Sequence, residues 1–104
     1  MRIATWNVNG LRARLDYITR WLEDRQPDVV GFQELKTPDE LFPHDYFKEL
    51  GYSALVHGQK SWNGVAILTK VPATLTGTGL ANQDAFGSRL ITANINDKLS
   101  FTTV

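Results

Sequence analysis

The sequence predicts an α/β protein, with a mixed sheet and a helix on one of its faces. A short strand pattern at 2–6 is followed by a helical pattern from Leu11 and then by the apolar run DVVGF at 28–32. A strand, a helix and a buried strand in this order form a βαβ unit, in which the two strands are parallel. From Tyr52 onward, most of the chain is typical of further strands.

The composition is that of one small folded domain. The chain has 104 residues, of which 42% are hydrophobic and 11% aromatic, enough to form a core. Lysine plus arginine and aspartate plus glutamate both number 11, so the net charge of zero favours neither nucleic acid nor membrane. Residues 1–22 nevertheless hold four arginines against one aspartate. The absence of cysteine excludes disulfides and thiolate zinc sites.

Neither a membrane span nor a signal peptide is evident in the sequence. No apolar run approaches the length needed to cross a bilayer, and the first five residues, MRIAT, are not typical of a signal peptide. The lack of cysteine fits a reducing compartment. We therefore expect a soluble, cytoplasmic protein that does not contact a membrane.

The first predicted helix begins at Leu11 and ends near Gln26. Its apolar residues recur at helical spacing at four positions: Leu11, Leu15, Ile18 and Leu22. Asn9 is placed to cap the helix with its side chain. Pro27 follows Gln26 and cannot continue the helix.

The middle of the chain is predicted to contain one more short helix. Polar residues and prolines at 36–43 indicate a loop, and residues 44–51 form one or two helical turns that end on Gly51. A second loop is expected at 76–88, where glycine, asparagine and aspartate are frequent.

Two pairs of strands complete the predicted sheet. The segments 52–58 and 64–70 flank a polar turn. The segments 89–95 and 98–104 flank Asn96-Asp97, a pair of residues that favours a tight hairpin.

Two polar residues follow the predicted parallel strands where each strand ends. Asn7 follows the first strand and Glu34 the second. The carboxyl ends of neighbouring parallel strands meet at one edge of a sheet, where open α/β sheets bind ligands. Amide and carboxylate oxygens suit Mg²⁺ or Mn²⁺ better than zinc, and Mg²⁺ is often held by one or two carboxylates with water and substrate phosphate. In such a site, Asn7 offers its NH₂ group to a phosphate or its oxygen to the metal.

Each of these residues also has an ordinary structural explanation. Asn9 is commonly only a helix cap, Asn7 a turn amide and Glu34 a strand-end carboxylate in water. Arg12 is typical of a solvated helix face, and Trp62 of half-buried packing in a turn. From the residue pattern alone, a magnesium–phosphate site is one candidate among these explanations.

Four segments of the chain carry a family resemblance: TWNVNGLRARL at 5–15, QPDVVGFQELK at 26–36, LGYSALVHGQKSWNGVAILTK at 50–70 and SRLITANI at 88–95. Together they resemble the exodeoxyribonuclease III family, the bacterial-type apurinic/apyrimidinic endonucleases of the endonuclease/exonuclease/phosphatase superfamily. These segments follow the order and spacing of the family along nearly the whole chain. The wider superfamily shares only the asparagine and glutamate motifs, whereas LRAR and the HGQK…NGVAILTK block are typical of the DNA-repair branch.

The resemblance implies a DNase I-like αββα sandwich of four layers, with helices on the outer face of each of two facing sheets. This chain would supply most of the first sheet. The resemblance also implies a Mg²⁺- or Mn²⁺-dependent DNA repair nuclease, both an apurinic/apyrimidinic endonuclease and a 3′–5′ exodeoxyribonuclease. Its substrate would be double-stranded DNA with abasic sites or 3′ ends, and the full-length protein would be a monomer.

The resemblance assigns roles to individual residues. Glu34 falls on the metal-binding glutamate of the family, and Asn7 on the asparagine at the scissile phosphate. Both are therefore candidate catalytic and metal-binding residues. Asn9 lies where some members carry aspartate. The candidate DNA-contacting residues are Asn9, Arg12, Lys36, Trp62, Asn63 and Arg89.

Three motifs of the family are not found in the sequence. The strand that ends at Val104 runs, in the family, into a Tyr-x-Pro-Asn motif, which Gly-Asp-x-Asn and Ser-Asp-His follow later. These motifs supply a tyrosine, a pair that orients the attacking water, and a histidine. We therefore expect residues 1–104 to be the N-terminal portion of a single domain, inactive alone because its C-terminal portion is missing.

The same resemblance leads to an expectation about stability and leaves two alternatives open. Without a facing sheet, the inward faces of the predicted strands would meet water, and the chain would fold poorly. One alternative is a phosphoesterase of the same superfamily that acts on RNA or an inositol phosphate. The other is a truncated product with no catalytic role.

Overall fold

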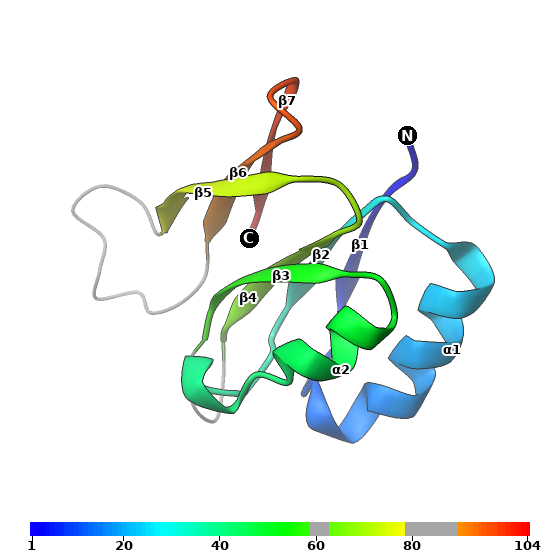
Figure 1. Cartoon of the computed structure of the whole chain (residues 1–104). Helices are drawn as coiled ribbons and strands as arrows, with labels where there is room; N and C mark the ends of the chain where they lie inside the picture. The colour runs from blue at the N-terminus through cyan, green and yellow to red at the C-terminus, as the bar shows by residue number, and fades with distance from the viewer. Residues whose placement is uncertain (59–62, 79–89) are drawn as a thin grey trace.

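The computed structural model describes residues 1–58, 63–78 and 90–104, and its strands form two sheets (Figure 1). The first sheet has the strand order β1-β2-β4-β3, and the second has the order β5-β6-β7. The strands of the first sheet are β1 Ile3–Asn7, β2 Val29–Gln33, β3 Ser53–His57 and β4 Val65–Thr69. Those of the second sheet are β5 Ala73–Thr78, β6 Ile91–Ile95 and β7 Leu99–Thr103.

The first sheet is mixed, as the sequence predicts. Strands β1 and β2 are parallel, whereas β4 is antiparallel to both β2 and β3. In the register of the parallel pair, Thr5 lies opposite Gly31 and Asn7 opposite Gln33. The two strands therefore end at the same level, and the residues that follow them emerge side by side.

Both predicted helices are present, and the structure adds one short helical segment. They are η1 Arg12–Arg14, α1 Leu15–Arg25, η2 Asp39–Leu41 and α2 His44–Glu49, in which η marks a 3-10 helix. The short helix η2 lies inside the segment 36–43 that was predicted as loop. In the part of the chain that the structure describes, no helix is long and apolar enough to span a membrane. A cytoplasmic location stays a prediction.

The predicted side-chain cap at Asn9 is wrong. The residues at the N-cap positions are Leu11 for η1 and Arg14 for α1, and neither makes a side-chain cap hydrogen bond. The backbone φ of Asn9 is 46°, in the left-handed region, whereas a capping residue is normally extended. Its side chain instead accepts a hydrogen bond from Lys36.

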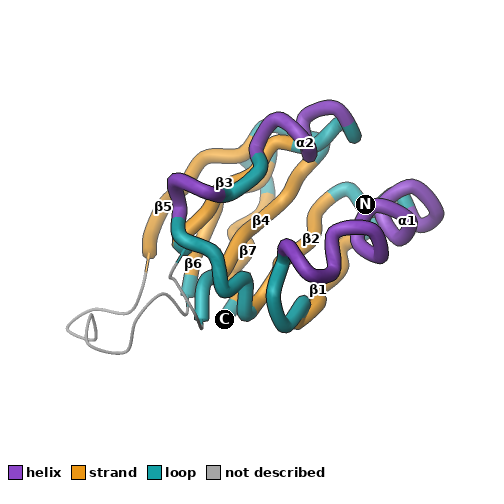
Figure 2. The backbone as a smooth tube through the Cα atoms, turned by 90° about the horizontal axis from the view of Figure 1, so that it is seen from below, coloured by secondary structure: helices purple, strands orange, loops and turns teal. Residues whose placement is uncertain are grey.

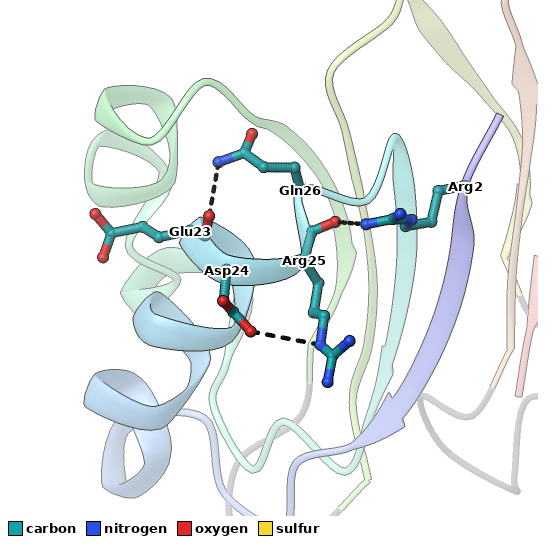
Figure 3. A network of polar contacts seen from close by, with 5 residues as sticks. All are labelled: Arg2, Glu23, Asp24, Arg25 and Gln26. Carbon is teal, nitrogen blue, oxygen red and sulfur yellow. Dashed lines mark hydrogen bonds and ion pairs between the residues drawn. The ribbon is translucent and has the colours of Figure 1, made fainter.

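Polar contacts fix the end of α1 against the start of the sheet (Figure 3). Gln26 ends the helix with a left-handed φ of 48°, and its side-chain Nε2 donates to the carbonyl of Glu23 at 3.1 Å. The guanidinium of Arg2 donates to the carbonyl of Arg25. A cation at a helix C-terminus satisfies an unpaired carbonyl and opposes the negative end of the helix dipole. Because Arg2 precedes β1, this contact joins the helix end to the sheet.

Two hydrophobic cores lie on opposite faces of the first sheet. One core packs the helices on the sheet, and its buried residues include Leu11, Ile18, Leu22, Val30, Phe32 and Phe47. The other core packs the two sheets together, and its buried residues are Val29, Val65, Ile67, Ile91, Ala93 and Ile95. Figure 1 shows α1 and α2 on the side of the first sheet that faces away from β5 and β6. In Figure 2, α1 lies next to β1 and β2 at one side of the view, and β5 lies at the other side.

The expectation that the first sheet lacks a facing layer is wrong. Ile67 on β4 and Ile91 on β6 are fully buried between the two sheets. Strand β5, which begins the second sheet, was not predicted, and residues 76–78 of it had been predicted as loop. Four of its six residues are exposed, and three of these are threonines, so no clear inward face is visible in the sequence. The expectation that the chain folds poorly rested mainly on an uncovered sheet, and this reason does not hold.

The second hairpin turns where it was predicted. Asn96 and Asp97 have φ values of 54° and 56°, as a two-residue type I′ hairpin turn requires. Strands β6 and β7 pair from Ile91 opposite Thr103 to Ile95 opposite Leu99. The hairpin thereby brings the end of β7 back over the first sheet.

The close approach of the two sheets depends on Gly31 in the middle of β2. A Cβ atom at this position would lie 2.7 Å from Oγ1 of Thr103 and 3.2 Å from Cε2 of Phe101. Since Thr103 is buried, it has little room to move away. A glycine in a central strand often marks such a close contact.

We expect Gly31→Ala to lower the free energy of unfolding by about 1–3 kcal/mol, because the added methyl overpacks the contact with Thr103. Gly77→Ala is the matched control, since nothing lies within 4 Å of its added Cβ. The control should stay within about 0.5 kcal/mol of the parent chain. Chemical denaturation measures both variants. Equal stabilities for the two would contradict the close sheet contact.

Tyr52 is a buried tyrosine that gives the fold a defined pH dependence. Its hydroxyl donates to the carbonyl of Pro27 at 2.6 Å, and the residue is 2% exposed. Burial, and then the negative charge of Asp28, raise the pKa of Tyr52 from its ordinary 10.0 to about 12. The folded state therefore holds this proton more tightly than the unfolded state does.

The stabilisation from Tyr52 is complete below pH 10 and is lost as the pH rises through about 12. We expect the free energy of unfolding of the parent chain to fall across this window. A Tyr52→Phe variant lacks the ionisable hydroxyl and should fall less steeply over the same pH range. Denaturation curves at a series of pH values measure both slopes, and parallel slopes would show that Tyr52 is not the group responsible.

Candidate functional site

Backbone hydrogen bonds join three loops at the carboxyl end of β1 and β2. The N–H groups of Gly10 and Leu11 donate to the carbonyls of Glu34 and Leu35, at 2.8 and 2.9 Å. On the other side, the N–H of Leu35 donates to the carbonyl of Gly64 at 3.0 Å. The loops after β1 and β2 and the residues before β4 thus continue the hydrogen bonding of the first sheet beyond its strands.

Several residues of these loops have an unusual backbone conformation. Four non-glycine residues have a left-handed φ, between 46° and 59°: Asn9, Glu34, Lys36 and Asn63. Such residues are uncommon, and they tend to cluster at functional sites, where surrounding contacts hold them in place. Here the hydrogen bonds between the loops provide those contacts.

Asn7 and Glu34 are in direct contact, as the sequence predicts for the ends of two parallel strands. The Nδ2 group of Asn7 donates to Oε2 of Glu34 at 2.6 Å. The Oδ1 atom of Asn7 accepts the backbone N–H of Asn9 at 3.1 Å. Because only the oxygen of the Asn7 amide, and not its NH₂ group, can accept the N–H of Asn9, both contacts support the same orientation of this amide. In this arrangement Asn7 holds the carboxylate of Glu34 in place.

Lys36 extends this chain of contacts. Its Nζ atom donates to Oδ1 of Asn9 at 2.6 Å, and both residues are exposed. The ammonium group is therefore linked to Glu34 through Asn9 and Asn7. The contact places one positive charge near the carboxylate of Glu34. The role of Lys36 and Asn9 in contacting DNA stays a prediction.

A pocket of about 230 Å³ opens at this edge of the sheet. Its lining includes Asn7, Gln33, Glu34, Asn63, Gly64 and Val104. A water molecule takes about 30 Å³ in the liquid, so the pocket has room for a hydrated ion and a phosphate group. Residues from β1, β2, β4 and the end of β7 thus meet around the predicted catalytic pair.

The other predicted DNA-contacting residues are less closely grouped. Arg12 is exposed on η1 and does not line this pocket. Asn63 lines it, and its carbonyl accepts the backbone N–H of Lys36 at 2.9 Å. Trp62 and Arg89 lie outside the described residues.

Among the polar residues that line this pocket, sequence reasoning missed Gln33. It is the last residue of β2, and its side chain contacts both Thr5 on β1 and Thr103 on β7. A signal was present in the sequence, since Val29, Gly31 and Gln33 alternate along one face of a buried strand. A polar residue on such a face needs a buried partner, and the partner is close only in the folded chain.

The donor atoms at this edge suit a hard divalent cation. Among residues 1–58, 63–78 and 90–104, no three or more histidine, aspartate or glutamate side chains are grouped so that they could hold a metal ion. A cation here would depend on Glu34, with water and substrate oxygens as the remaining ligands, an arrangement that Mg²⁺ tolerates. A structural zinc site, with four protein ligands, does not fit.

Residues 4–104 match the model of the Endonuclease/Exonuclease/phosphatase family. The chain belongs to this family. The four-layered αββα sandwich expected for an endonuclease/exonuclease/phosphatase fold accounts for the two facing sheets and for helices on one outer face.

Individual members of the family are similar along most or all of the chain. Over its whole length it is 41% identical to exodeoxyribonuclease III of Haemophilus influenzae, of which it covers 39%. The 3′ phosphatase NExo from Neisseria, solved bound to a product DNA hairpin, matches with a TM-score of 0.92 and 34% identity, covering 98% of this chain and 40% of that one. For an AP endonuclease from Archaeoglobus fulgidus the TM-score is 0.86 and the identity 36%, covering 92% and 37%. The chain thus spans about two fifths of the length of these relatives.

Proposed function

We propose that the chain is the N-terminal portion of a DNA repair nuclease that uses Mg²⁺ or Mn²⁺. Its reaction is the hydrolysis of phosphodiesters in double-stranded DNA, at abasic sites and at 3′ ends. The 2.6 Å contact between Asn7 and Glu34, at a pocket on the carboxyl edge of the sheet, is the observation that carries the proposal. The similarity to an exodeoxyribonuclease III and to an AP endonuclease supports it.

Each residue of the pair has a separate task in this proposal. Glu34 binds the cation, which when bound supplies positive charge that stabilises the phosphate in the transition state. Asn7 orients the carboxylate of Glu34 through its NH₂ group, and the N–H of Asn9 fixes the Asn7 amide. Such fixed positions matter because catalysis of phosphoryl transfer rests largely on orientation and electrostatics.

The DNA strand approaches this edge of the sheet in the same proposal. Lys36 adds a positive charge beside the pair, and Arg12 lies exposed on η1, in the arginine-rich part of the chain. Their role would be to contact the phosphates of the duplex, together with Asn9 and Asn63. The same role is proposed for two residues outside the described ranges, Trp62 and Arg89.

The 104 residues alone should not reach the rate of a complete enzyme. Along the described residues, the pocket offers one carboxylate and the side-chain amides of Asn7, Gln33 and Asn63, but no histidine to protonate or bind the phosphate. We therefore propose that further residues of a longer domain complete the site, and that the complete protein is monomeric. A superfamily enzyme for RNA or inositol phosphates, and a chain with no catalytic role, remain the alternative functions.

A chimaera tests the proposed function. In it, residues 1–104 replace the aligned segment of the Haemophilus influenzae exodeoxyribonuclease III. We expect the chimaera to cleave a DNA duplex at a single abasic site when Mg²⁺ is present, and we expect excess EDTA to stop this cleavage. The 104-residue chain alone should be inactive in the same assay. The unmodified Haemophilus enzyme is the control. Cleavage that continues undiminished in EDTA would refute the metal mechanism, and preference for RNA or inositol phosphates would favour the alternative.

A further inference from the structure

We propose that Gln33 is a positioning residue that fixes the second sheet beside Glu34, an inference that rests on the proposed role of Glu34 in binding the cation. Gln33 directly precedes Glu34 in the chain. Its Nε2 group donates to Oγ1 of Thr5 on β1 at 2.7 Å and to Oγ1 of Thr103 on β7 at 2.5 Å. It also lies 3.2 Å from the carbonyl oxygen of Gly31. One amide thereby joins two strands of the first sheet to the second sheet.

The position of Gln33 in β2 makes this bridge unusual. Val29 and Gly31 share its face of the strand, where the two sheets pack together. An aliphatic side chain would suit an inward face of this kind, yet the position holds an amide between two hydroxyls. Because Thr103 is only 4% exposed, its hydroxyl depends on a partner inside the protein. The amide and the two hydroxyls thus fix one another's positions.

The bridge determines where β7 ends relative to the site. Thr103 lies over Gly31, where a Cβ atom would meet its Oγ1 at 2.7 Å. The next residue, Val104, lines the same pocket as Asn7 and Glu34. Without the amide of Gln33, β7 can shift against the first sheet while the apolar contacts between the sheets remain.

The backbone of Gln33 supports the other half of the site. Its carbonyl accepts the N–H of Val8, the residue directly after Asn7, at 3.0 Å. Gln33 therefore holds the loop that carries Asn7 through its carbonyl, and β7 through its side chain. Residues that orient a metal ligand without binding the metal themselves commonly raise its affinity, and removing them lowers the metal affinity by about 10- to 100-fold.

The affinity of the 104-residue chain for Mn²⁺, measured by water-proton relaxation, tests the proposal. Gln33→Met and Thr103→Val each remove the bridge with little change in volume. We expect the dissociation constant for Mn²⁺ to rise about tenfold or more in both variants. Thr103→Ser keeps the hydroxyl and should bind as the parent chain does. Thr102→Val is the matched control, because Thr102 is exposed and its hydroxyl bonds Thr92 instead.

Chemical denaturation of every variant separates positioning from stability. A merely structural role would lower the stability of Gln33→Met and Thr103→Val and leave the Mn²⁺ affinity of the folded chains unchanged, which overturns the proposal. Two variants on opposite sides of the bridge keep the test valid if one of them fails to fold. If the parent chain does not bind Mn²⁺, or if Glu34→Gln binds it equally well, the proposed metal site and the role of Gln33 are both wrong. Binding that depends on Glu34 but not on the bridge overturns only the role of Gln33.

Discussion

Glu34→Gln in the chimaera is expected to lower the turnover of abasic-site DNA by about 100- to 1,000-fold. The substitution keeps the shape of the side chain and removes its negative charge, so the cation loses the one carboxylate that lines this pocket in the described part of the chain. Charge stabilisation by a metal ion contributes several kcal/mol in the transition state, and about 1.4 kcal/mol corresponds to a factor of ten in rate. The apparent Mg²⁺ requirement should rise at the same time.

Single-turnover cleavage at a series of Mg²⁺ concentrations measures both effects of Glu34→Gln. Glu40→Gln is the matched control, since Glu40 is an exposed glutamate on η2. The control should retain the rate and the metal requirement of the unmodified chimaera. A Glu34→Gln variant with the same rate and metal dependence as this control would show that the site is assigned to the wrong carboxylate.

Asn7→Ala is expected to lower turnover by about 10- to 100-fold, because it removes the hydrogen bond that orients Glu34. The loss should be smaller than that of Glu34→Gln, since the carboxylate itself remains. Asn7 is exposed, so the substitution should leave the stability of the fold nearly unchanged.

Measuring both the rate and the stability of Asn7→Ala separates a role of Asn7 in catalysis from a role in the fold. Denaturation curves of the variant and its parent show whether the fold is intact, and single-turnover rates at saturating DNA show whether the chemical step has slowed. We expect a slower step in an intact fold. A variant with the parental rate would exclude Asn7 from the site, and a lower rate that only follows lost stability would make its role structural.

The contact between Asn7 and Glu34 could be predicted from sequence because it follows from simple topology. A strand, a helix and a strand in succession form a right-handed parallel unit, so the ends of both strands lie at one edge. The helix between them was recognisable from Leu11, Ile18 and Leu22, which are all buried on the helix-packed core. Local pattern and overall fold agree along this part of the chain.

The second sheet and the bridge at Gln33 could not be predicted in the same way. Strand β5 has mostly exposed side chains, and its place in a separate sheet depends on pairing with β6. The partners of Gln33 include Thr103, which lies 70 residues away in the sequence. Local spacing predicts a helix cap at Asn9, whereas the left-handed backbone of Asn9 and its contact with Lys36 depend on the neighbouring loop.

Paramagnetic broadening by Mn²⁺ in the ¹H–¹⁵N spectrum of the 104-residue chain tests the metal site at Asn7 and Glu34 most directly. We predict that small amounts of Mn²⁺ first broaden the signals of residues around this pocket, among them the backbone N–H signals of 7–10 and 34–36 and the side-chain NH₂ signals of Asn7. The same addition should leave these signals sharp in Glu34→Gln. Broadening centred on another part of the chain, or broadening of the same signals in Glu34→Gln, would contradict the account.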